Sequence, residues 1–404
     1  MPLPPRLLVA DQVAGSIRVL NLPDGREAGV VEGRHLAEHA GFLALPGDRW
    51  AFVDDLAGEL VVLDPYGPDA GRPLIAATAP VATPAEHLAA DPSGRRLAVT
   101  TGLGRSWEPW SDLLTAVDLD TGRAVRVRTR AGEPGVTLLD GPGGPLVVLR
   151  HREPGTLTAY RYADLIAAPP ACPALPPAYE TDLPDHDGHG DAHDPRTGRL
   201  FAAAGSGVHR ARRDGDRLVT EEPLPWAGPG RGYYLRLDPV RRVLWSCVRG
   251  GPTDPGRWPE WTNDAWSHAL DTGRTDRVPL GPGLVFRLAI AAHHVAYARV
   301  HPDGDELILL DRMEPRVVAR RPLPPMDGAP KPGGTPWDGV QRRAIAASPG
   351  APLIAVTRGG HGVVHLFDGT EPVAALTVPT PLDDGGHLAL IAPGDGADGD
   401  PVGR

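Results

Sequence analysis

The chain has 404 residues, including 50 glycines and 47 prolines, and a formal net charge of −10. This negative charge, without a basic stripe to offset it, argues against nucleic acid as a partner. No run reaches the roughly 18 apolar residues of a membrane helix, and the opening MPLPPRLLVADQ lacks the charged and apolar regions of a signal peptide. We therefore expect a cytoplasmic protein that does not contact a membrane.

A turn followed by a short apolar strand is repeated along the chain. The clearest copies are LPGDRWAFV from Leu45, DPSGRRLAV from Asp91, GPGGPLVVL from Gly141, DPRTGRLFA from Asp194, DPVRRVLWS from Asp238 and SPGAPLIAV from Ser348. A second strand follows each copy and often ends in an acidic turn, as in LTAVDLDTG from Leu114. Strand-and-turn units repeated in this way predict an all-β radial array, the β-propeller.

The two ends of the chain predict how the ring closes. The opening segments RLLVADQ, SIRVLNL and REAGVV read as the second, third and outermost strands of an incomplete blade, and HLALIAP from His387 supplies its innermost strand. Pairing these strands removes free sheet edges. The complete blades are expected to start near His39, His87, Val136, Gly190, Tyr234, Arg287 and Ala344. This predicts eight blades, or seven if two weak units merge, in one domain over residues 1–393, with a disordered acidic tail at 394–404.

The repeated Asp-Pro and Ser-Pro turns before apolar strands resemble YVTN-type and methylamine-dehydrogenase-heavy-chain-like propellers over nearly the whole chain. This resemblance implies the fold. The opening LLVADQVAGSIRVLNLPDG, together with HGDAHDPRTGRLFAAAGSGVHRAR from His189, resembles more weakly the secreted zinc-chaperone propellers. In that family histidines at the mouth of the ring hold the metal, which implies metal binding here as well.

Loops that join the outermost strand to the next blade, or the second strand to the third, emerge on one face of a propeller. We call this the upper face. Its loops are the longest in the chain and hold six of the nine tryptophans, namely Trp107, Trp110, Trp226, Trp258, Trp261 and Trp337. Because a tryptophan is costly to expose, the cluster predicts a wall of a substrate pocket, formed by all of these except Trp226. The alternative is that the loops pack on one another.

Polar residues that precede or begin the innermost strands are expected at the upper mouth of the central channel. Four are histidines from different blades, His39, His87, His189 and His387. Neutral imidazoles suit zinc and other first-row transition metals, so these four are the candidate ligands of a divalent metal. The alternative for each is a structural role at the mouth.

The same mouth is expected to contain groups for catalysis and for anion binding. His87 or His189 can act as a general base, and Tyr233 or Tyr234 can donate a proton. Five arginines can bind a carboxylate or phosphate of the substrate, namely Arg105, Arg249, Arg287, Arg342 and Arg343. These groups suit an anionic or aromatic small molecule.

Several motifs are missing from the sequence. There is no G-x-S-x-G elbow, no P-loop and no dinucleotide fingerprint, so no nucleotide cofactor is expected. The two cysteines, Cys172 and Cys247, exclude a disulfide framework and leave a single bridge open. The sequence favours an enzyme that uses a metal or histidine for hydrolysis, elimination (a lyase) or ring opening at the channel mouth. The alternatives are a non-enzymatic metal-binding protein and a platform for protein interactions.

Overall fold

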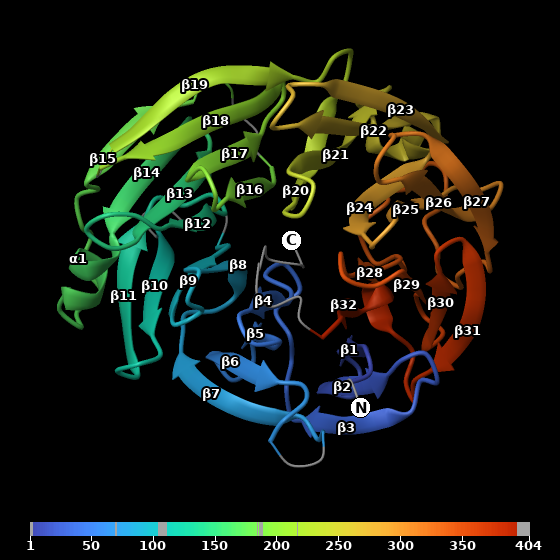
Figure 1. The fold of residues 1–404 in the computed structure, drawn as a ribbon, viewed down its shortest axis with the longest axis horizontal. Coiled ribbons are helices and arrows are strands. Elements are labelled where there is room, and N and C mark those ends of the chain that lie inside the picture. Colours follow the sequence, from blue (N-terminus) through green and yellow to red (C-terminus); the bar gives the residue numbers. More distant parts are fainter. Residues whose placement is uncertain are drawn as a thin grey trace.

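The computed structural model describes residues 3–68, 71–103, 111–183, 185, 189–215 and 217–393. In this part of the chain the strands form eight four-stranded antiparallel sheets, arranged as blades around a central axis (Figure 1). The predicted fold class, an eight-bladed β-propeller, is confirmed. The tail predicted at 394–404 lies outside the described residues.

Seven blades are continuous in the chain and run from the innermost to the outermost strand. The first four contain β4 (Leu43–Leu45), β5 (Arg49–Asp54), β6 (Glu59–Asp64) and β7 (Leu74–Pro80); β8 (Ala85–Ala90), β9 (Arg96–Thr101), β10 (Asp112–Asp118) and β11 (Arg123–Thr129); β12 (Gly135–Leu139), β13 (Leu146–Arg152), β14 (Gly155–Arg161) and β15 (Tyr179–Asp182); and β16 (Asp191–Asp194), β17 (Arg199–Ala203), β18 (Gly207–Asp214) and β19 (Arg217–Pro225).

The next three contain β20 (Arg231–Asp238), β21 (Val243–Gly250), β22 (Thr262–Ala269) and β23 (Thr275–Pro282); β24 (Leu284–Ile290), β25 (His294–Val300), β26 (Asp305–Asp311) and β27 (Val317–Leu323); and β28 (Ile345–Ala347), β29 (Leu353–Arg358), β30 (Val363–Asp368) and β31 (Glu371–Thr377). Among the described residues, the helical segments are α1 (Tyr162–Ala167), η2 (Pro255–Glu260) and η3 (Asp383–Gly385). The predicted blade starts differ from the observed ones by four residues or fewer.

The eighth blade joins the two ends of the chain, as predicted. Its innermost strand is β32 (His387–Ile391), followed outward by β1 (Arg6–Asp11), β2 (Ser16–Asn21) and β3 (Glu27–Glu32). Strand β1 pairs antiparallel with β32, with Arg6 opposite Ile391 and Ala10 opposite His387. The last strand therefore covers the inner edge of β1 and closes the ring.

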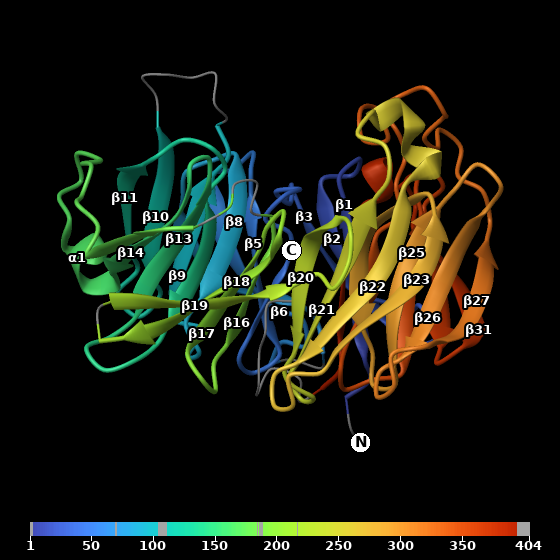
Figure 2. The same ribbon diagram turned by 90° about the horizontal axis from the view of Figure 1, so that it is seen from above.

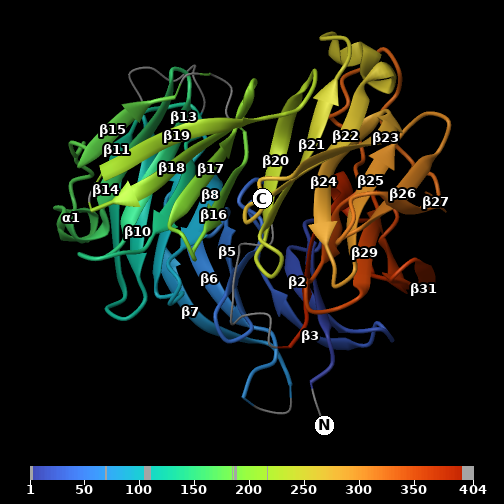
Figure 3. The same ribbon diagram turned by 45° about the horizontal axis from the view of Figure 1, so that its top comes forward.

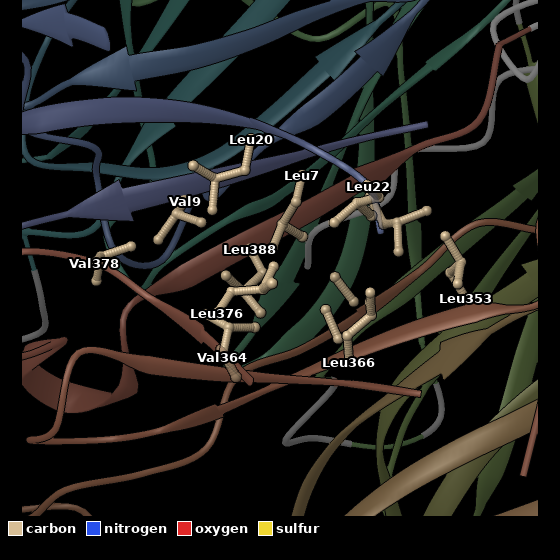
Figure 4. Packing of buried hydrophobic residues seen from close by; sticks show 14 of the residues in the cluster. Leu7, Val9, Leu20, Leu22, Leu353, Val364, Leu366, Leu376, Val378 and Leu388 are labelled. Atoms are coloured by element: carbon tan, nitrogen blue, oxygen red, sulfur yellow. The ribbon is translucent and has the colours of Figure 1, made fainter. Parts of the chain in front are cut away.

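The hydrophobic core lies between neighbouring blades. Figure 4 shows the layer between the closing blade and the blade of β28–β31, where Leu7 and Leu388 lie close to Val364 and Leu376. Each fully buried side chain of this size contributes roughly 1.5–3 kcal/mol relative to an exposed one. Each blade of the closed ring lies between two neighbours, so both faces of its inner strands are covered. These strands are therefore apolar at consecutive positions rather than at every second one.

Buried arginine–aspartate pairs also connect neighbouring blades. The Arg242 guanidinium donates from Nη1 to both carboxylate oxygens of Asp194, at 2.8 Å each. Arg312 donates to both oxygens of Asp238, and the two side chains are 4% and 0% exposed. Both aspartates come from the repeated Asp-Pro turns, so these turns supply carboxylates for contacts between blades as well as reversing the chain.

The loops on the two faces differ in size. Figure 2 shows η2 on the upper face, opposite the side where the N-terminus lies, and in Figure 3 η2 stands above the upper ends of β21 and β22.

Cys172 and Cys247 are both free thiols, so the bridge that the sequence left open is absent. Within the described ranges, no helix is long and apolar enough to span a bilayer.

Replacing Arg312 with methionine should lower the free energy of unfolding by about 3–5 kcal/mol, because the Asp238 carboxylate is then buried without its partner. The matched control is Arg95→Met, since Arg95 and Asp120 form an ion pair in which the side chains are 60% and 58% exposed. This control should cost less than about 1 kcal/mol. Urea denaturation of both variants measures the difference, and equal losses would contradict the structural role of the buried pair.

Candidate functional site

Three innermost strands are interrupted by β-bulges near their upper ends. The pairing register shifts between Ala85 and His87 in β8, between Gly232 and Leu235 in β20, and between Val285 and Leu288 in β24. A bulge bends its strand and redirects the side chains beside it. The residues redirected in this way are Glu86, Tyr233, Tyr234, Phe286 and Arg287. Three blades therefore contribute irregular backbone and polar or aromatic side chains to the same mouth.

One feature of the mouth is a stack of rings around one guanidinium. The Arg249 carbon Cζ lies 3.9 Å from the Tyr233 ring centroid and 4.1 Å from that of Trp261. On one side the His189 ring meets Tyr233 edge-on at 5.8 Å, and on the other Trp337 stacks on Trp261 at 6.1 Å. We call these five residues the aromatic–arginine stack. Such contacts hold a cation by the electron-rich faces of the rings.

Local backbone geometry brings the members of the stack together. In the ladder between β20 and β21, Arg231 pairs with Arg249, so the start of one strand lies beside the end of the other. Gly190 has φ of 97°, and a Cβ atom there would lie 2.6 Å from the carbonyl oxygen of Tyr233. Glycine at this position therefore allows the segment with His189 to approach β20 closely.

The loop between β21 and β22 is held by its tryptophans. Trp258 is fully buried, and its Nε1 donates to the carbonyl of Lys331 at 3.2 Å. Trp261 is 4% exposed and donates to the carbonyl of Pro252 at 2.8 Å. Trp258 thus packs between two loops. It does not face a substrate pocket, which corrects the prediction from the sequence. Trp337 is 38% exposed and remains accessible beside Trp261.

A second group of side chains surrounds His387, at the start of β32. Arg287 donates from Nη1 to Nδ1 of His387 at 3.4 Å. Arg342 donates from Nη2 to the Glu38 carboxylate at 3.1 Å and lies 5.7 Å from the Phe286 ring centroid. Burial, with the charges of Arg287 and Arg342, holds the pKa of His387 well below its usual value. His387 is therefore neutral at physiological pH.

The other mouth histidines differ in protonation. His39 meets Glu86 with 2.7 Å between Nδ1 and the carboxylate oxygen, and this contact raises the pKa of His39. Burial lowers the pKa of His189 to about 3, assisted by the nearby charges of Arg150 and other basic groups that include His39. His87 lies half-buried in β8, next to Glu86. The upper mouth thus contains one histidine with a raised pKa, His39, and two neutral histidines, His189 and His387.

The predicted metal ligands do not form a ligand set in this arrangement. In the described ranges, no group of three or more His, Cys, Asp or Glu side chains is placed to hold a metal ion. Nδ1 of His39 is engaged by Glu86, and Nδ1 of His387 faces the Arg287 guanidinium. These positions suit a network of hydrogen bonds better than a cation.

The remaining predicted residues have different environments. Arg343 is 5% exposed, donates from Nε to Asp305 at 2.7 Å and from Nη1 to the Thr357 carbonyl at 3.0 Å. It connects two blades, which corrects its predicted role in binding substrate. Tyr234 lies 5.9 Å from the His189 ring. Arg105, Trp107 and Trp110 lie outside the described residues.

Sequence reasoning missed two members of the mouth. Arg231 donates from Nε to the Tyr233 hydroxyl, with its Cζ 4.7 Å from the same ring, and Phe286 lies beside Arg342. Both are next to or near residues that the sequence singled out. The signal that could have found them is their position at the start of innermost strands.

Comparison with known proteins identifies the fold and no family. No protein-family model matches the chain, and no curated protein matches its sequence. Among solved structures, AztD from Citrobacter koseri superposes with a TM-score of 0.66 at 12% identity, over 96% of this chain and 97% of that one. NirN, a dihydro-heme d1 dehydrogenase in complex with DHE, gives 0.59 at 16% identity, over 94% of this chain and 75% of that one.

These identities show a shared propeller fold alone. The resemblance to YVTN-type and methylamine-dehydrogenase-like propellers is not confirmed beyond that level. A functionally unknown protein from Desulfotomaculum acetoxidans DSM 771 is also similar, with a TM-score of 0.53 at 11% identity over 78% of this chain and 94% of that one.

Because several buried histidines are neutral, we expect the free energy of unfolding to fall as the pH drops. Burial lowers the pKa of His151 and His189 to about 3 and that of His193 to about 4. Unfolded histidine titrates near pH 6.5, so between about pH 6.5 and 4 the unfolded chain binds more protons and unfolding is favoured. Urea denaturation from about pH 7.5 to about pH 4.5 measures this slope.

Replacing His151 with glutamine should flatten that slope, because one proton fewer is taken up on unfolding. His39→Gln is the control, since the pKa of His39 is raised rather than lowered. If His151→Gln and His39→Gln change the slope equally, the neutral state of His151 is refuted.

Proposed function

We propose that the upper mouth binds a small anionic molecule with a flat apolar part and acts on it by hydrolase- or lyase-type chemistry. The observation that carries this proposal is the position of Arg249 between Tyr233 and Trp261. Over the described ranges, Arg249 contacts the Tyr233 and Trp261 rings and Arg287 contacts His387, and neither arginine forms an ion pair with a carboxylate. A cation that is held in place and has no counter-ion among the described residues supports the binding of an anion.

The surroundings of Arg249 support the flat, apolar part of the ligand. A guanidinium binds carboxylate or phosphate through paired N–H groups, and an aromatic face accepts another ring. Trp337 provides an accessible ring at the end of the stack. Binding sites for small molecules commonly combine apolar walls with a few placed polar groups in this way.

The chemistry would use His189 and the tyrosines beside it. A neutral imidazole can accept a proton, and the Tyr233 and Tyr234 hydroxyls can donate one. A bound anion opposes the arginine charges that help to lower the pKa of His189, so binding makes this imidazole a stronger base. Negative charge that develops during hydrolysis or elimination would be stabilised by Arg249 and Arg231.

The metal-binding alternative has one observation in its favour. His189 and His387 are neutral, which is the protonation state that metal coordination requires. The engagement of His39 by Glu86 and of His387 by Arg287 weighs against it. The interaction platform is supported less, because Trp258 and Trp261 are buried.

Replacing Arg249 with methionine should weaken binding of an aryl carboxylate or aryl phosphate by about 10- to 100-fold, since a charged hydrogen bond is worth about 1.5–3 kcal/mol. Methionine keeps the packing between the two rings, so the melting temperature should hardly change. Isothermal titration calorimetry against a panel of such compounds measures the affinity, and turnover of aryl esters and lactones tests the chemistry.

Two controls separate binding from folding. Arg274→Met changes an arginine on a turn of the lower face, 62% exposed, and should affect neither property. Arg343→Met should lower stability by about 3–5 kcal/mol, because it leaves Asp305 unpaired. An unchanged affinity in Arg249→Met, or the absence of any ligand in the panel, would rule out the proposed site.

A further inference from the structure

Arginines near the upper mouth differ in the groups that hold them. Three pair with carboxylates, namely Arg150 with Asp191 at 2.7 Å, Arg152 with Glu133 at 2.6 Å and Arg342 with Glu38 at 3.1 Å. Arg249 and Arg287 are held by neutral groups instead, which are the rings of Tyr233 and Trp261 for the first and the His387 imidazole for the second. In the described part of the chain, the mouth therefore contains two cations that are fixed in place and have no ion-pair partner.

The carboxylates of the mouth are engaged by other groups. Glu38 and Asp384 lie 3.1 and 3.8 Å from Arg342, Glu86 contacts His39 at 2.7 Å, and Asp55 accepts the backbone N–H of Ala85 at 2.9 Å. Glu133 and Asp191 belong to the pairs with Arg152 and Arg150. Among these acidic side chains none is left to neutralise Arg249 or Arg287, so a bound anion is the natural counter-ion for each.

Arg249 and Arg287 belong to neighbouring blades. Arg249 lies near the upper end of β21, and Arg287 lies in β24, the innermost strand of the next blade (Figure 1). Trp261, whose ring contacts Arg249, packs in one cluster with Leu284, and Phe286 packs against the same cluster. The cation held by the aromatic–arginine stack therefore lies beside the strand that contains the second cation.

The partner of Arg287 shows where its guanidinium lies. Nη1 donates at 3.4 Å to Nδ1 of His387, which begins the innermost strand of the closing blade. The blade of β28–β31 separates these two blades in the ring, so the side chain passes its innermost strand on the side of the channel. A guanidinium has five N–H donors, and the contact with His387 uses one of them. The others are available for a ligand in the mouth.

We propose that Arg287 forms a second anion-binding subsite of the upper mouth, so that the ligand is a flat aromatic molecule with two anionic groups. One group binds Arg249, the other binds Arg287, and the ring lies against the aromatic residues between them. Two cations in one mouth repel each other, and a ligand with a single charge neutralises only one of them. This inference rests on the function proposed for the upper mouth and specifies its substrate class.

The test compares benzoate with phthalate, isophthalate and terephthalate, whose two carboxylates are spaced differently on the same ring. Isothermal titration calorimetry should show that at least one dicarboxylate binds the wild type about 10- to 100-fold more tightly than benzoate, because a second charged hydrogen bond is formed. In Arg287→Met this affinity ratio should fall below about threefold, close to the advantage of having two equivalent carboxylates. Arg249→Met should weaken binding of benzoate and of the dicarboxylates alike.

A control and a second variant separate charge recognition from folding. Arg257→Met changes an arginine of the loop between β21 and β22 that is 56% exposed and pairs with Glu260, and it should leave the affinity ratio unchanged. Arg287→Gln removes the charge but retains an N–H donor for Nδ1 of His387. It should lower the ratio as Arg287→Met does, and it provides the test if the methionine variant does not fold, as judged by near-ultraviolet circular dichroism.

The outcomes distinguish the second subsite from the proposed function. If no dicarboxylate binds the wild type more tightly than benzoate, or if the ratio persists in the Arg287 variants, the second subsite is overturned. When Arg249→Met weakens all four compounds and Arg287→Met leaves the ratio unchanged, the subsite alone fails and the proposed function stands. Unchanged binding of all four compounds in Arg249→Met would overturn the function proposed for the stack, whatever the result with Arg287→Met.

Discussion

Pairing between β1 and β32 is the constraint on which the geometry of the whole ring depends. With that ladder in place each blade is held between two neighbours, and the upper ends of the innermost strands face a common axis. Contacts across the mouth then join residues far apart in the chain: Arg342 meets Glu38, and Arg287 meets His387. Without closure these side chains would belong to separate surfaces. The upper mouth is thus a product of the ring as a whole.

The local sequence pattern predicted the blades because each blade is a continuous meander. Its turns and apolar strands can be recognised in a short stretch of sequence. The Asp-Pro turns, the incomplete first blade and the final strand from His387 sufficed for the count and the closure. The bulges at Tyr233 and Arg287 could not be predicted in the same way, because a bulge is defined by the register of the partner strand. The pairing of Asp194 and Asp238 with arginines of neighbouring blades was hidden for the same reason.

The sequence predicted the region of the candidate site better than it predicted the roles of single residues. Arg342 and Arg343 are adjacent in the sequence, yet one faces the mouth and the other is buried beside Asp305. Their charges are identical, so only the direction of each side chain separates a binding role from a structural one. Trp258 and Trp337 differ in the same way, through packing of two loops that are distant in the chain. Residue type alone could not have revealed either difference.

The position of Arg249 between two rings also has an entropic consequence. A free arginine side chain samples many rotamers, and ordering a side chain of this kind on association costs about 0.5–1.5 kcal/mol. Here folding has already restricted that freedom, so an arriving anion meets a guanidinium whose plane is set. Selectivity then follows from shape: a ligand whose anionic group and ring cannot align with this plane at the same time loses one of the two contacts.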